Sequence, residues 1–481
     1  IGGTLVRLSE RPFFTKNNIG EDPIRNTMYG LDVNYRKDMP RLTKLLDKLP
    51  FYSTTAPSTL NFYAEGALLK PGHAPQIGSG GAGTVYIDDF EGSQSSVDLR
   101  FPAVSWALAS TPQGATDANG NGIFPEGILN NNLDYGKNRA KLAWYQIEPT
   151  LQLYKGSNNP LGANRNELSD PQVRLVTQSE IFPQKTTDFG QNQLTTFDLA
   201  YYPTQKGPYN FDSNPASIDA NDNLKNPQAR WGGLMRNIDQ SDFETANVEF
   251  IEFWVQDPFV KTPVSATAGG KLYFNLGDIS EDVLKDGRRF YENGLPTPNA
   301  PSPVDNTTVW GVAPLNPIQV TNAFSNDPLE RPYQDVGFDG LNDAGERLKR
   351  TDYLNALGGV LNSTALQQVT ADPSLDNYVH YRDSRFSAND GILERYKNFN
   401  NPQGNSKVND GAAYSSAATL YPDAEDLNKD NTMNEAEQYF QYIVDVKPNT
   451  DPSMQIGVNY IIDKKLVPVK LVNGNTRNET W

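Results

Sequence analysis

The chain has 481 residues and a formal net charge of −16, with 42 Lys and Arg against 58 Asp and Glu. That balance argues against nucleic acid as a partner, because phosphate binding needs clustered basic residues. The sequence contains no cysteine, which excludes disulfides, thiolate zinc sites and a cysteine nucleophile. Aromatic residues make up 11% of the chain, a content that favours folded β cores.

Residues 1–75 predict antiparallel strands with one short helix. In 27–35 and again in 60–68, apolar and polar residues alternate. A period of two is typical of a half-buried strand in a soluble sheet, and equally of a strand in a membrane barrel. The pattern alone favours the soluble sheet. Between these strands, four leucines at helical spacing predict a helix over 39–49 that begins near Pro40 and is stopped by Pro50.

Residues 76–300 predict a β-sandwich or jelly-roll-like region. The glycine-rich stretch 78–83 indicates a linker, because no phosphate-loop continuation follows it. Short apolar and aromatic runs with turn-rich spacers recur as far as residue 284. Among them 248–255 predicts a central strand, and the expected core residues are Phe250, Trp254, Phe274 and Leu276.

Residues 301–438 predict an irregular, loop-rich region, because turn formers dominate 296–317 and 400–414. Regular β pattern returns over 439–481. We expect strand 440–446 to share one sheet with 27–35 and 58–69, so that the middle of the chain is an insertion between strands. The chain starts at Ile1 without an initiator Met or a signal peptide, and we expect it to be a piece of a longer protein.

Residues 426–437 predict a structural calcium site. Calcium loops place oxygen ligands at positions 1, 3, 5, 7, 9 and 12. At the sixth position, where such loops carry glycine, this sequence has Asn431, which tolerates the left-handed conformation. An acidic surface turn is the alternative. The predicted ligands are Asp426, Asn428, Asp430, Thr432, Asn434 and Glu437.

Other acidic clusters, at 117–122, 219–223 and 335–346, favour metal-free turns. The sequence offers few candidates for a general acid or base at neutral pH, because it has only two histidines, His73 and His380. Asp88 and Asp89 point to opposite faces of a predicted strand and cannot act as a carboxylate pair. We therefore expect a protein that is not an enzyme.

Several long stretches of the chain carry a family resemblance, namely 4–15, 21–36, 49–53, 85–92, 106–111, 142–149 and 392–402. They resemble the SprA/Sov family, the outer-membrane translocon of the type IX secretion system of Bacteroidetes, which is also linked to gliding motility. The resemblance runs over nearly the whole chain but covers only part of that very long polypeptide.

The resemblance implies a mainly β fold, in which a jelly-roll-like insertion is flanked by strands of a giant transmembrane β-barrel, and a role in the wall and cap of a protein-conducting channel at the cell surface. It implies as partners outer-membrane lipid, a small barrel subunit that receives cargo, a periplasmic plug protein, a prolyl isomerase, and secreted cargo with C-terminal secretion domains. Residues 84–100 also resemble the opening strand of a carbohydrate-binding jelly roll. A surface glycan-binding module is therefore the alternative function, which solvent-accessible tryptophans would favour.

Overall fold

The computed structural model divides the chain into two compact units, one formed by 1–95 with 246–248 and the other by 96–245 with 249–481. The glycine-rich stretch 78–83, the strand expected at 85–87, Asp88, Asp89 and His73 lie outside the described residues. Those described are 1–10, 24–51, 53, 56–72, 96–153, 159–161, 166–185, 192–240, 242–246, 248–260, 269–289, 303–315, 327, 329–330, 337–399, 424–472 and 474–481.

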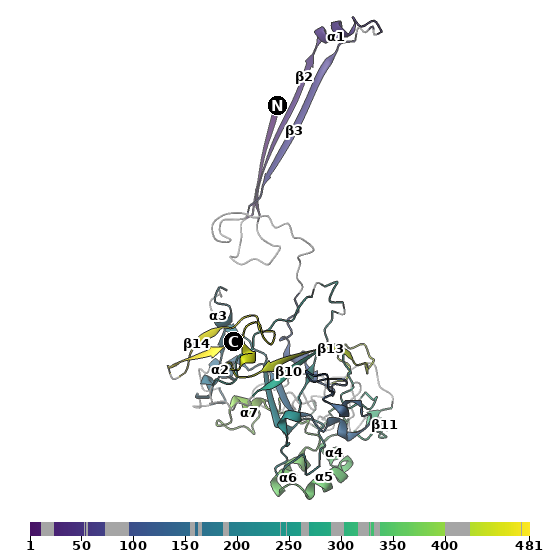
Figure 1. The fold of residues 1–481 in the computed structure, drawn as a ribbon, viewed down its shortest axis with the longest axis vertical. Helices are drawn as coiled ribbons and strands as arrows, with labels where there is room; N and C mark the ends of the chain where they lie inside the picture. Colours follow the sequence, from purple (N-terminus) through teal and green to yellow (C-terminus); the bar gives the residue numbers. More distant parts are fainter. Residues whose placement is uncertain are drawn as a thin grey trace. The chain divides into compact units, whose positions relative to one another are not determined.

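The first unit is a three-stranded antiparallel sheet in the order β1-β2-β3, drawn in Figure 1 as a long, narrow ribbon. Its strands are β1 (Gly2–Ser9), β2 (Arg25–Asp38) and β3 (Thr59–Lys70), and α1 (Pro40–Leu46) lies between β2 and β3 in the chain. The strands and helix predicted for this region are thus confirmed. Each strand pairs residue by residue with its neighbour, without a bulge. Alternate side chains therefore point to opposite faces of the sheet, as the sequence pattern predicts.

The second unit has two-stranded antiparallel sheets, so the mainly β character is confirmed in outline. The described residues form neither a jelly roll of two stacked sheets nor a closed barrel. The pairs are β4 (Ala107–Leu108) with β9 (Leu234–Met235), β5 (Ala140–Tyr145) with β8 (Asp198–Lys206), β6 (Val176–Thr177) with β7 (Gln193–Leu194), β10 (Gly270–Asp278) with β13 (Gln438–Val446), β11 (Val304–Asp305) with β12 (Ala313–Pro314), and β14 (Leu466–Lys470) with β15 (Thr476–Thr480).

Helices occupy part of the region predicted to be irregular. Of these, α4, α5 and α6 contact one another and lie together in Figure 1. Asn342 and Asn362 cap α4 and α6 by accepting hydrogen bonds from backbone N–H groups of the first turn. The helices of the second unit are α2 (Pro149–Leu153), α3 (Gln178–Ile181), α4 (Asp343–Lys349), α5 (Thr351–Gly358), α6 (Ser363–Ala371) and α7 (Ile392–Tyr396). Within the described part of the chain, no helix has both the length and the apolar content needed to cross a bilayer.

The core of the second unit is assembled from segments that are distant in sequence. Trp310 and Leu357 are fully buried in its larger cluster. Arg139 is also fully buried, and its guanidinium donates to the backbone carbonyls of Pro208 and Val283, each at 3.2 Å. Buried side chains therefore tie irregular backbone to the core where ladder hydrogen bonds are few.

Two strand predictions are wrong. Residues 248–255 form no strand, and Phe250 is 66% exposed. The β propensity of 248–255 is not realised, and β10, which carries the predicted core residues Phe274 and Leu276, pairs with β13. For the same reason the expected sheet joining 440–446 to 27–35 and 58–69 is not formed, since Tyr442 lies opposite Phe274. The idea of an insertion between strands of one sheet fails with it.

Candidate functional site

The sheet of the first unit brings two predicted apolar stripes onto one face. Tyr29 lies between Leu5 and Leu68, and Tyr35 lies opposite Phe62. Paired residues of an antiparallel ladder point to the same side of the sheet. We call this side the apolar face; it consists of Leu5, Tyr29, Leu31, Val33, Tyr35, Leu60, Phe62, Ala64 and Leu68.

Basic residues lie at both ends of the apolar face. At one end Arg7, Thr27 and Lys70 form a rung, and at the other Lys37 lies opposite Leu60. At about 3.3 Å per residue, the ten positions from Thr27 to Lys37 span about 33 Å. For strands tilted by about 40°, that length corresponds to a height of about 25 Å, which matches the apolar band of outer-membrane barrels.

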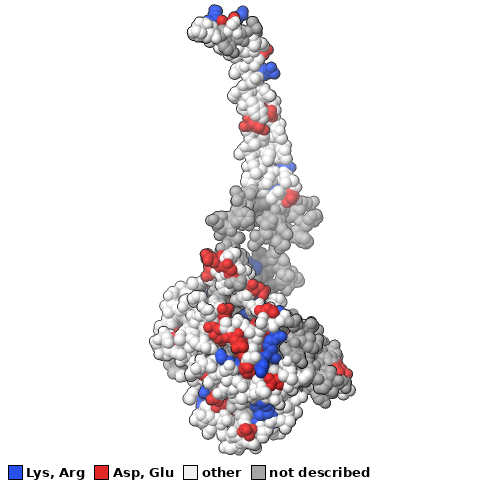
Figure 2. All heavy atoms as spheres, turned by 90° about the vertical axis from the view of Figure 1, so that its right-hand side faces the viewer, with Lys and Arg blue, Asp and Glu red and all other residues white. Residues whose placement is uncertain are grey.

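The apolar face is open to solvent in this chain. Leu31 is 58% exposed and Leu68 is 65% exposed. No described residue from 1 to 72 is buried. In Figure 2 the surface of these strands is mostly uncharged, with a few acidic and basic side chains spaced along it. An apolar surface of this extent marks a contact with another protein or with lipid.

The opposite face of the same sheet is mainly polar. Asp32 lies opposite Glu65, and Asn34 lies opposite Tyr63. The Tyr63 hydroxyl donates a hydrogen bond of 2.8 Å to Glu65. This face is thus suited to water along the part of β2 from Asp32 to Asp38, and nearer its other end it carries one exposed apolar rung, formed by Val6, Met28 and Leu69.

The predicted calcium loop, 426–437, is ordered by bonds between its side chains and its own backbone. Asp426 accepts from the N–H of Asp430 at 3.1 Å and from that of Asn431 at 2.9 Å. Asp430 accepts from the N–H of Thr432 at 2.7 Å. Asn431 has φ of +68°, the left-handed conformation expected at this position.

Other parts of the second unit also hold this loop. Glu281 accepts from the N–H of Leu427 and from that of Asn434, both at 2.9 Å. Arg289 lies 3.6 Å from Asp426. Glu437 accepts from the Ser280 N–H at 3.3 Å, and burial raises the pKa of its carboxyl to about 7.

The predicted ligands include amide and backbone oxygens as well as three carboxylates. Among the described residues, the carboxylates of Asp426, Asp430 and Glu437 are not a group in which one oxygen of each lies within 4.8 Å of the other two. Asn428 donates to Asp430 at 3.0 Å. Calcium at this loop therefore stays a prediction.

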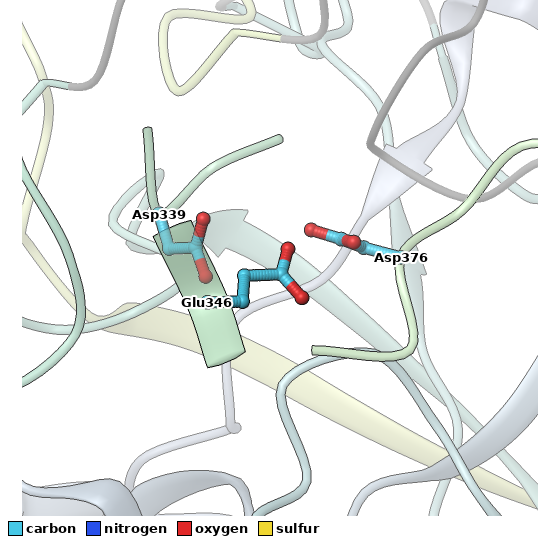
Figure 3. A group of neighbouring side chains, drawn as sticks. All are labelled: Asp339, Glu346 and Asp376. Atoms are coloured by element: carbon cyan, nitrogen blue, oxygen red, sulfur yellow. The ribbon is translucent and has the colours of Figure 1, made fainter. Parts of the chain in front are cut away.

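A second acidic site lies in the interior of the second unit. Asp339, Glu346 and Asp376 each offer an oxygen within 4.8 Å of the other two, and all three are fully buried. Asp339 precedes α4, Glu346 lies on α4 and Asp376 follows α6. Figure 3 shows Glu346 between the other two carboxylates, with Asp376 turned toward it.

Neighbouring polar groups hold both oxygens of Asp339, where the Leu341 N–H donates to Oδ1 at 3.0 Å, and one oxygen of each of the other two carboxylates. The Ser374 hydroxyl donates to Asp339 at 2.7 Å, and the Ser374 N–H donates to Glu346 at 3.1 Å. The Tyr209 hydroxyl donates to Asp376 at 2.8 Å. These bonds set the orientation of the three carboxylates before any ligand binds.

Glu346 also belongs to a second group, with Asp343 and Asp372, whose oxygens lie within 4.8 Å of one another. Both of these residues are half-buried, so this group extends from the interior toward solvent. The five carboxylates together are called the acidic cluster: Asp339, Asp343, Glu346, Asp372 and Asp376.

Burial dominates the electrostatics of the acidic cluster. Loss of hydration raises the pKa of Asp339 to about 6 and that of Glu346 to about 10, the latter helped by the neighbouring Asp339. The pKa of Asp376 is raised for the same reasons. Arg350, itself buried, lies 3.7 Å from Asp339 and opposes part of this effect.

Sequence reasoning singled out three of the five residues of the acidic cluster and missed the other two. The stretch 335–346 was noted, but a metal-free turn was favoured, and its first residue, Asp335, lies outside the described residues. Asp372 and Asp376 are far from it in sequence, and the turn of the chain after α6 brings them back to α4. The signal that points to this turn is the Asn362 cap with apolar residues four apart on α6.

The structure places His380 in the interior rather than in an accessible cleft. It is 6% exposed, and its ring stacks on Tyr381 with centroids 4.2 Å apart. Its Nδ1 accepts from the Arg382 N–H at 3.1 Å. These contacts are those of a core side chain.

Comparison with known families identifies one match. A family model described as motility related/secretion protein matches residues 352–481. The matched region contains α6, the calcium loop, β13 and two members of the acidic cluster. No curated protein matches the chain.

Proposed function

The chain belongs to the SprA family of motility related and secretion proteins, and on that premise we propose that it is a structural segment of a protein-conducting outer-membrane translocon of the type IX secretion system. The strands β1–β3 would form part of the barrel wall, and the second unit part of the cap. The observation that carries the proposal is the apolar face, which is exposed and has basic residues at both ends.

An uncovered apolar sheet face is costly in water. Each square ångström of apolar surface removed from water contributes about 25 cal/mol. Lipid would cover the apolar face, while the polar face with Asp32, Asn34 and Glu65 would line a water-filled lumen.

The edges of the sheet support the same proposal. Within the described residues, β1 and β3 each pair with β2 on one side only. A bilayer requires every backbone N–H and C=O group to be paired, so a sheet in lipid must close through further strands. In the proposed arrangement those strands lie on either side of β1 and β3 in the same barrel.

The environment of the tryptophans supports a structural role over glycan binding. Trp144 and Trp231 are 4% and 8% exposed, and Trp106 and Trp254 are half-buried. The Trp254 ring lies under the Lys465 ammonium, at 4.2 Å from its centroid. A sugar platform needs accessible rings, and these rings are engaged within the fold.

The proposal extends to location and partners. A wall segment of this kind belongs in the outer membrane at the cell surface, with lipid against the apolar face. It would assemble with the small cargo-receiving barrel subunit, the periplasmic plug and the prolyl isomerase, and would pass cargo with C-terminal secretion domains. Calcium at 426–437 would order the approach to β13 in this setting.

The test compares one substitution on each face of β2 in cells that produce the protein. Leu31→Arg places a charge at the middle of the apolar face, where it costs about 2–4 kcal/mol in lipid. We expect outer-membrane abundance and cargo secretion to fall at least tenfold. Asn34→Arg, on the polar face, is the matched control and should assemble normally. Normal assembly and secretion by both variants would contradict the proposal.

A further inference from the structure

The acidic cluster contains two buried oxygen atoms without a partner. Glu346 Oε1 and Asp376 Oδ1 form no hydrogen bond, although both side chains are fully buried. The other oxygen of each carboxylate is held, by the Ser374 N–H and by the Tyr209 hydroxyl respectively. The two unpartnered oxygens belong to carboxylates that face one another in Figure 3. A buried carboxylate oxygen in this state is costly unless a ligand satisfies it.

From these observations we propose that the acidic cluster binds a divalent cation, for which calcium is the best match. Asp339, Glu346 and Asp376 would be the inner ligands. The proposal concerns residues outside the calcium loop at 426–437, and it does not depend on the function proposed above.

The spacing of the oxygens fits calcium. Calcium binds oxygens at about 2.3–2.6 Å, so two ligands on opposite sides of one ion lie about 4.6–5.2 Å apart. Magnesium, at about 2.1 Å, would bring such ligands to about 4.2 Å and demands stricter geometry. Within each group of three, one oxygen of each carboxylate lies within 4.8 Å of the other two, close enough for one ion to bridge them. This limit admits both spacings, so calcium is favoured by its tolerance of irregular geometry. Carboxylates alone, without histidine or cysteine in either group, favour a hard cation over zinc or copper.

The charge of the cluster also favours a cation. Arg350 forms an ion pair with Asp339 at 3.7 Å. Lys141 attracts Asp372 and Lys349 attracts Asp339 at longer range. Five carboxylates therefore exceed the nearby basic groups, and a divalent ion would balance the excess. Without it the cluster must hold protons.

The second group gives the ion a route from solvent. Asp343 and Asp372 are half-buried and share Glu346 with the inner group. Asn377 donates to Asp343 at 3.0 Å, and the Asp376 N–H donates to Asp372 at 3.2 Å. An ion that enters at this outer group can pass to the inner one through Glu346. Once bound, it would link α4 to the turn after α6.

The first test measures thermal unfolding of the whole chain with calcium and with chelator. We expect millimolar calcium to raise the Tm of the wild-type protein by roughly 3–5 °C. Glu346→Gln keeps the shape of the side chain but removes its charge. In chelator this variant should melt close to the wild-type temperature, because Glu346 holds a proton when no ion is bound and the amide replaces a neutral carboxyl. The part of the calcium-dependent rise that comes from the acidic cluster should be lost.

The second test uses terbium, which takes the place of calcium and emits when a nearby aromatic ring is excited. Tyr209, bonded to Asp376, is placed to sensitise that emission. We expect emission that calcium displaces, and a loss of terbium affinity of at least tenfold in Asp376→Asn. Asp430→Asn, in the calcium loop, is the matched control and should keep the signal. A Tm unaffected by calcium, or emission equal in wild type and Asp376→Asn, would overturn the proposal.

Discussion

The two units of this chain handle their apolar and charged residues in opposite ways. In the sheet β1–β3 no described residue is buried, and apolar side chains such as Leu31 lie open on one face. In the second unit Trp310 and Leu357 are fully buried, and so are charged groups such as Arg139 and Glu346. The described residues of the first unit form no buried core, whereas the second unit has a core that also encloses charged side chains.

The difference shows that the two units are stabilised from different sources: the first by an external medium and the second by side chains of this chain. A regular ladder satisfies its backbone internally but leaves its apolar face for an external medium to cover. Irregular segments need side chains to satisfy their carbonyls, as Arg139 does for Pro208 and Val283. The stability of the second unit is therefore set inside this chain, and that of the first by its surroundings.

The largest expected effect comes from the same truncation made in each unit. Leu357→Ala removes a fully buried side chain and should lower the free energy of unfolding of the second unit by about 2–5 kcal/mol. Leu31→Ala, at a side chain 58% exposed, should change stability in water by less than about 0.5 kcal/mol. Urea unfolding of the two variants measures both values. Equal losses would mean that the apolar face is already covered within the chain.

A smaller effect is expected from a half-buried carboxyl on β8. Burial raises the pKa of Asp198 from 3.8 to about 6. The folded state thus holds this proton more tightly than the unfolded state. Asp198 therefore costs no stability below pH 3.8, and its destabilising contribution grows as the pH rises to about 6.

Asp198→Asn should remove that loss. We expect the variant to exceed the wild type by up to about 3 kcal/mol at pH 7 and to match it near pH 3.5. Denaturant midpoints at both pH values measure the difference. A constant difference at the two pH values would show that Asp198 does not titrate as its environment indicates.

The smallest effect concerns the calcium loop. Asp426→Ala with Glu437→Ala removes two predicted ligands, and a weak site contributes on the order of 1 kcal/mol at ten times its Kd or less. We expect this part of the calcium-dependent stabilisation to disappear, while the part that depends on Glu346 remains. Thermal unfolding of the double variant, with calcium and with chelator, separates the two. An undiminished response to calcium would leave the loop as an acidic turn.

Elements that a local residue pattern specifies could be predicted from the sequence. Features that depend on contacts between distant parts of the chain could not. The alternation in 27–35 and 60–68 and the leucines near Pro40 specify strands and a helix without reference to the rest of the chain. The partner of β10 was not predictable in this way, because β13 lies far along the chain and its pattern fits more than one neighbour. For the same reason only three of the five residues of the acidic cluster were singled out from the sequence. Asp376 reaches Glu346 only through the packing of α4 to α6.

The central claim, that the apolar face meets lipid and the polar face meets water, is tested most directly by spin labels along β2. The chain has no cysteine, so single cysteines introduced from Tyr29 to Arg36 report one position each. The protein would be measured in outer membranes, against oxygen, which enters lipid, and against a water-soluble nickel chelate. The account predicts oxygen contact highest at 29, 31, 33 and 35 and nickel contact highest at 30, 32, 34 and 36. Oxygen and nickel contact that rise and fall together along the strand would contradict it.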